Sequence, residues 1–184
     1  MVRWLGLQAR VGYADQGYAM NKQIDSSKGP TDRVLLCVLD DTEELHIALD
    51  YASVRSKRTG ARVGLLFVMG QADSFQHWAS VGDLMREEAR ADAERRLLQA
   101  AARVKRLSGL TPLLYIREGQ RGEEVVKQIE EDSNIAFLIL AANTGKEGPG
   151  PLITEITGKA IGRLHIPLVI VPGNMSEEEV QSFA

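Results

Sequence analysis

Short apolar runs alternate with amphipathic segments along most of the chain, beginning near residue 33. Each run is nearly continuous in Val, Leu, Ile and Ala, a pattern typical of strands that are buried on both faces. Between the runs, apolar residues recur three and four positions apart, which is helical spacing. The pattern predicts five strands, at residues 33–40, 61–69, 111–117, 134–142 and 166–172, with a helix in each connection.

The predicted helices differ in length and in the signals at their ends. Thr42 can cap the first, and Gly60 follows its last apolar position. The apolar stripe of the second, longest helix comprises Val81, Leu84, Met85, Ala89, Ala93, Leu97, Ala101 and Val104, and that of the fourth comprises Ile156, Ala160, Ile161 and Leu164. Strands that alternate with helices imply right-handed crossovers and a parallel sheet covered on both faces. The predicted fold class is therefore α/β.

The length of 184 residues suits one domain with short additions at its ends. Residues 1–32 show no sustained periodicity and end in polar and breaker residues, which predicts a flexible N-terminal extension. Met20 could be an alternative translation start. We assign residues 33–172 to the domain and residues 173–184 to a C-terminal tail.

Composition narrows the classes of function. The net charge of −3 and pI near 5.7 argue against a broad nucleic-acid-binding surface. No apolar run has the length of a membrane span, and the N-terminus is a poor signal peptide, so we expect a cytoplasmic protein. The single Cys37 excludes an intramolecular disulfide, and its setting in VLLCVL predicts a buried thiol.

Two polar stretches follow predicted strands of the sheet. LDDT follows the first strand and GKEGPGPLITEITGK, residues 145–159, follows the fourth. Ligands of open parallel sheets bind beyond the carboxyl ends of the strands, so these stretches could meet in one crevice. The second stretch is not a Walker A loop, because Ile153 and Ala160 occupy required positions, and Ile153 also breaks a G-x-G-x-x-G reading.

A third glycine pattern fits. Gly145, Gly148 and Gly158 have the spacing of the G-x2-G-x9-G-[S/T] signature. Together with VLLCVLDDT, IREGQRGEEVVKQI and HIPLVIVPG, in that order, they make residues 33–172 resemble the universal stress protein family. The resemblance implies a five-stranded parallel sheet of order 3-2-1-4-5, commonly in a homodimer, which we expect to form through the strand Pro167–Pro172. A long apolar edge strand is a liability unless it is paired or covered.

The resemblance also implies a ligand, ATP or another adenine nucleotide, with or without Mg. Glycines let a backbone approach phosphate, and successive N–H groups can form an anion-binding nest. The family's adenosine contact maps onto Asp40, and its backbone contact to adenine maps onto Val68. Its phosphate cradle maps onto Gly145, Gly148 and Gly158, with Lys159. Asp41 is interpreted as solvated. The predicted function is a stress regulator without strong catalysis.

Two departures from the family pattern and a choice between two alignments leave an alternative open. Lys159 stands where the family has Ser or Thr, although a lysine can pair with phosphate as a point charge. Pro149 and Pro151 supply no N–H. Thr154 or Thr157 could supply a hydroxyl or simply face solvent. Alignment by the fourth strand instead of by spacing places Ala142 and Gly145 at the first two glycines. The alternative function is a nucleotide-free, homodimeric protein-interaction module.

Catalysis finds little support in the sequence. No Ser-His-Asp or Cys-His arrangement can be read, and the spacing of His46, His77 and His165 predicts no metal site. Glu147 and Glu155 could at most assist a slow ATP hydrolysis. The run REEARADAERR is interpreted as a solvated helix face with ion pairs Asp92–Arg96 and Arg90–Glu94. The segment FQHW, residues 75–78, could close the crevice or pack against the long helix or a dimer partner.

Overall fold

A computed structural model of the protein describes residues 32–70 and 79–184. The N-terminal extension and the FQHW segment lie outside these residues. The described part forms five parallel strands in the order β3-β2-β1-β4-β5, as predicted. Their bounds are Val34–Leu39 (β1), Arg62–Met69 (β2), Leu113–Glu118 (β3), Ile135–Ala142 (β4) and Leu168–Pro172 (β5).

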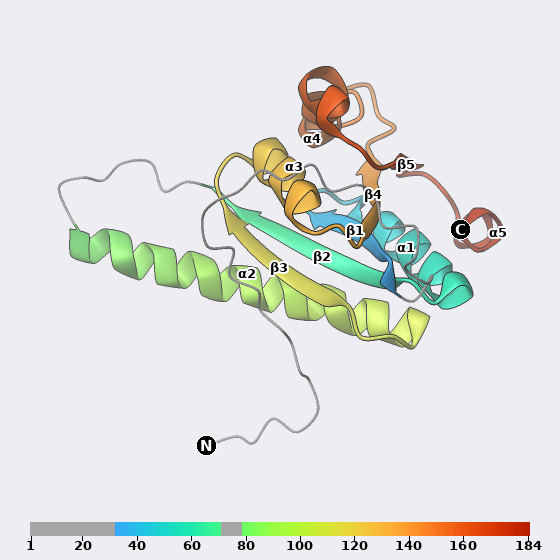
Figure 1. The fold of residues 1–184 in the computed structure, drawn as a ribbon, viewed down its shortest axis with the longest axis horizontal. Coiled ribbons are helices and arrows are strands. Elements are labelled where there is room, and N and C mark those ends of the chain that lie inside the picture. Colours follow the sequence, from blue (N-terminus) through green and yellow to red (C-terminus); the bar gives the residue numbers. More distant parts are fainter. Residues whose placement is uncertain (1–31, 71–78) are drawn as a thin grey trace, which may run out of the picture.

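Helices cover both faces of the sheet (Figure 1). One face packs under α1 (Leu45–Thr59) and α2 (Ala79–Ser108), and the other under α3 (Arg121–Glu131) and α4 (Pro151–Glu155). The central strand β1 is buried along its whole length. Its Cys37 is completely buried, and burial raises the pKa of the thiol to about 12, so the thiol stays protonated. The prediction of a buried thiol is confirmed. No described helix is long and apolar enough to cross a membrane.

The start of α1 differs from the prediction. Thr42 does not cap this helix, which has Glu44 at its N-cap position; the Thr42 hydroxyl donates to the Asp40 carboxylate over 2.7 Å. The helix begins at Leu45, after Glu44, whose side chain makes no capping hydrogen bond. A short turn separates Thr42 from the helix, with the Leu45 N–H 3.4 Å from the Thr42 carbonyl oxygen. The helix therefore begins beyond the predicted cap.

The fourth predicted helix is irregular. It begins at Pro151 as α4, widens into a π-helical turn, η2 (Ile156–Ala160), and ends in a 3₁₀ turn, η3 (Ile161–Arg163). The wide turn shifts the register of the apolar face. Ile156 and Ala160 are buried as predicted, whereas Ile161 is 50% exposed. A single α-helical period therefore misplaces Ile161.

The last twelve residues include a helix, α5 (Glu177–Phe183), that the apolar pattern did not indicate. Ser176 begins it in a capping box: its hydroxyl accepts from the Glu179 N–H at 3.2 Å, and the Glu179 carboxylate accepts from the Ser176 N–H at 2.8 Å. Val180 is 3% exposed and joins the core under α1. Arg58 of α1 donates to the carbonyl oxygens of Gln181 and Ala184. The helix is thus docked on α1.

We expect Val180→Ala to lower the free energy of unfolding by about 2 kcal/mol, because it removes buried apolar surface. Glu178→Ala, on the exposed side of the same helix, should change it by less than about 0.5 kcal/mol. Urea denaturation followed by circular dichroism measures both. Equal stabilities for the two variants would mean that α5 is not held on the core in solution.

Candidate functional site

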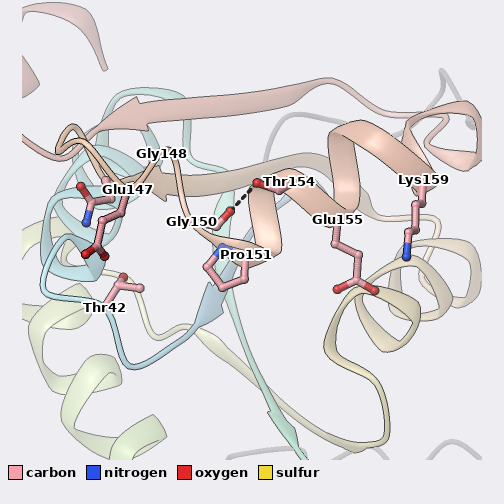
Figure 2. A pocket seen from close by; sticks show the side chains of 9 residues that line it. Thr42, Glu147, Gly148, Gly150, Pro151, Thr154, Glu155 and Lys159 are labelled. Atoms are coloured by element: carbon pink, nitrogen blue, oxygen red, sulfur yellow. Dashed lines mark hydrogen bonds between the residues drawn. The ribbon is translucent and has the colours of Figure 1, made fainter.

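A hollow in the described part of the structure lies beyond the carboxyl ends of β1 and β4, where the strand order reverses. It is a cavity of about 650 Å³, a volume suited to a small-molecule ligand. Figure 2 shows it between the loop after β1 and the first turns of α4. We call it the crevice; its lining residues are Thr42, Asn143, Glu147, Gly148, Gly150, Pro151, Thr154, Glu155 and Lys159.

The loop after β4 turns sharply into α4 through two glycines. Gly148 has φ +88° and Gly150 has φ +105°, both in a region that side chains disfavour. At the start of the loop, the Asn143 side-chain oxygen accepts from the Gly145 N–H at 2.5 Å. The Asn143 N–H reaches the Pro149 carbonyl oxygen at 3.3 Å, which closes the loop on itself. Backbone conformation therefore fixes the rim of the crevice.

The hydroxyl groups around the crevice are already engaged as donors. Thr154 donates to the Gly150 carbonyl oxygen over 2.9 Å, the bond drawn in Figure 2. Thr157 donates to the Ile153 carbonyl oxygen over 2.7 Å. Thr42 donates to Asp40, as described above. Each hydroxyl has one proton, so none of the three can also donate to a ligand without breaking its present bond. Neither threonine considered from the sequence is free to replace the family's hydroxyl.

Three charged side chains line the crevice. Figure 2 shows Glu155 and Lys159 pointing the same way from the helix, with Glu147 on the other side of Pro151. Lys159 is exposed, and the structure records no ion pair for it within the described part of the chain. The Glu155 carboxylate lies directly over Gly122, in the first turn of α3, where a Cβ atom would collide with it. A carboxylate at this place is stabilised by the positive end of the helix.

Comparison with known proteins identifies the family. The model of the universal stress protein family matches residues 32–172. The chain belongs to this family. Among proteins with curated descriptions, none matches it.

Solved structures agree with the fold. Universal stress protein UspA from Lactobacillus plantarum superimposes with a TM-score of 0.64 at 14% identity, over 76% of this chain and 97% of that one. A family protein from Burkholderia pseudomallei gives 0.58 at 18% identity, over 79% and 99%. A universal stress protein in complex with cAMP gives 0.52 at 13% identity, over 77% and 98%.

The structure separates the residues that the family resemblance grouped. Gly148 and Lys159 line the crevice, whereas Gly145 and Gly158 do not. Gly158 lies in the π-helical turn, well inside the helical segment, and no atom would lie within 4 Å of an added Cβ there. Val68 is buried in the core under α3 and lines no described cavity. Sequence reasoning did not single out Asn143 as a lining residue, although it directly follows β4.

Asp40 lines a neighbouring, smaller cavity of about 340 Å³ between α1 and α2, and Thr42 lines both cavities. The Asp40 carboxylate accepts from the N–H of Thr42 at 3.3 Å as well as from the Thr42 hydroxyl. Asp41 is exposed to solvent as expected, and Arg96 of α2 also pairs with it. Arg96 also pairs with Asp92 at 2.8 Å and lies 5.9 Å from the centroid of the Phe67 ring. These contacts tie the loop after β1 to α2.

Two further observations concern charge. The predicted pairs Asp92–Arg96 and Arg90–Glu94 are confirmed, with the second at 3.3 Å. Within the described ranges, no three side chains of His, Cys, Asp or Glu are grouped so that they could hold a metal ion. A metal at the crevice would therefore need oxygen atoms from a ligand or water.

The two glycines of the α4 segment should respond oppositely to alanine. Gly150→Ala should lower the free energy of unfolding by about 1–3 kcal/mol, because alanine is strained at its φ. Gly158→Ala should raise it by about 0.5–1 kcal/mol, because the site is helical and open. Thermal and urea unfolding of both variants test this. Destabilisation by Gly158→Ala would instead mean that the π-helical turn requires glycine.

Proposed function

We propose that the protein is a stress regulator that binds an adenine nucleotide in the crevice, without strong catalysis. The observation that carries the proposal is the crevice itself: a cavity of about 650 Å³ at the reversal of strand order, rimmed by a glycine-rich loop and by Lys159, which has no ion pair among the described residues. The family membership and a related structure solved with cAMP support an adenine ligand. Composition favours a cytoplasmic protein.

Lys159 is the cationic group that we expect to contact phosphate, taking the role of a hydroxyl in the family signature. A hydrogen bond to a charged group contributes about 1.5–3 kcal/mol, and exposure of Lys159 reduces this to about 1 kcal/mol. Lys159→Ala should therefore weaken binding of AMP and ATP about fivefold. Lys146→Ala, in the same loop but outside the crevice lining, should leave affinity unchanged.

Isothermal titration calorimetry measures these affinities, and repetition at high salt should weaken binding to wild type more than to Lys159→Ala. Equal affinities for wild type and Lys159→Ala would remove the lysine from the proposed site. Mass spectrometry of small molecules released from gently purified protein tests the function directly. Absence of nucleotide there, together with no binding in titrations, would defeat it.

A homodimer through β5 is the second part of the proposal. Within the described residues β5 pairs only with β4, so its outer edge is open. Ile170 on this strand is 42% exposed, whereas Val171 is buried in the core. An open apolar edge favours pairing with another chain. The same edge supports the competing function, a nucleotide-free interaction module, which predicts a dimer without any bound nucleotide.

Ile170→Lys tests the dimer without disturbing the core. A charge at the centre of an interface costs roughly 2 kcal/mol or more, which raises the dimer dissociation constant about thirtyfold. Leu110→Lys is the control, because Leu110 has similar exposure and lies after α2. Light scattering coupled to size-exclusion chromatography at micromolar concentration distinguishes them. A wild-type monomer under these conditions would rule out the β5 dimer.

A further inference from the structure

The crevice carries more negative than positive charge. Its lining includes two carboxylates, Glu147 and Glu155, and a single ammonium group, Lys159. The contact of Glu155 with the start of α3 offsets part of its charge, but Glu147 lies on an exposed loop, and the structure records no ion pair for it among the described residues. The field at the crevice therefore opposes a ligand with several negative charges.

Neutral side-chain groups that could donate a hydrogen bond to a ligand in the crevice are also few. The hydroxyls of Thr42 and Thr154 are engaged, as described above. Pro149 and Pro151 flank Gly150 and have no N–H to offer a phosphate oxygen. The Asn143 side-chain oxygen is held by the Gly145 N–H, which leaves the Asn143 amide NH₂ as the neutral side-chain donor of the lining. One ammonium and one amide are thus the side-chain donors that the lining offers to a phosphate group.

We propose that the crevice selects an adenine nucleotide with one phosphate, such as AMP or a cyclic monophosphate, over ATP. This inference rests on the proposed function and names its ligand. The phosphate monoester of AMP carries about −1.5 to −2 charges at pH 7 and the diester of a cyclic monophosphate about −1, whereas each further phosphate adds about one more. Lys159 and the Asn143 amide hold the first phosphate. Glu147 repels the added ones, so selectivity arises from charge and not from the adenine contacts.

The test compares AMP, cyclic AMP and ATP by isothermal titration calorimetry, first in EDTA and then with excess Mg²⁺. In EDTA, wild type should bind AMP at least about fivefold more tightly than ATP. Repulsion of the two added phosphate charges by one carboxylate at roughly 8 Å in water gives a factor of this size. Glu147→Gln should reduce this ratio about fivefold. Glu178→Gln on α5, which lies outside the crevice lining, should leave it unchanged.

Each result has a distinct meaning. ATP binding as tightly as AMP in EDTA overturns the selectivity, and so does Mg·ATP binding more tightly than AMP. An unchanged AMP-to-ATP ratio in Glu147→Gln, with the variant folded by circular dichroism, also overturns it. If no adenine nucleotide binds in either buffer, the proposed function fails, whereas binding of all three with equal affinity retains that function and defeats only the selectivity.

Discussion

The hydrogen bonding of β1 on both sides determines where this protein can hold a ligand. β1 pairs with β2 on one side and β4 on the other, and all its residues are buried. The chain must therefore leave its carboxyl end in one direction, while the chain leaving β4 turns in the other. The loops diverge, and the crevice is the space between them. Every lining group comes from one of these two loops or from the helical segment after β4.

Local hydrogen bonding decides what the crevice offers chemically. Threonines in its wall donate to backbone carbonyls or to a nearby carboxylate, which stabilises the turns but removes donors from the ligand side. Glycines take conformations that the turn requires, so they shape the rim, and prolines beside them supply rigidity without N–H groups. The loop is thus well defined in shape, and the side-chain donors left for an anion are those of Lys159 and Asn143.

The pattern of apolar residues predicts the sheet well, because short continuous apolar runs in a chain of this composition form few structures other than buried strands. The five strands and their order follow from that pattern and from the family resemblance. The site is harder to predict, since it depends on where a helix begins. Spacing to the other glycines placed Gly158 in the phosphate cradle, but the helical segment starts at Pro151, so Gly158 lies inside it.

Short-range signals were the ones that sequence reasoning missed. Ser176 and Glu179 have the spacing of a capping box, yet the helix they begin contains one buried apolar residue, Val180, and so shows no stripe. Thr42 hydrogen-bonds a carboxylate two residues earlier, and α1 begins only at Leu45, a helix start that sequence alone did not place.

The contact between Glu155 and Gly122 joins the two halves of the fold. Gly122 belongs to the helix after β3, and Glu155 belongs to the helix after β4, so the carboxylate bridges elements that are distant in the sequence. No side chain fits at position 122 while Glu155 keeps its place. Among divergent relatives that share this apposition, a larger residue at the first position should require the acid either to take another rotamer or to be replaced by a shorter residue.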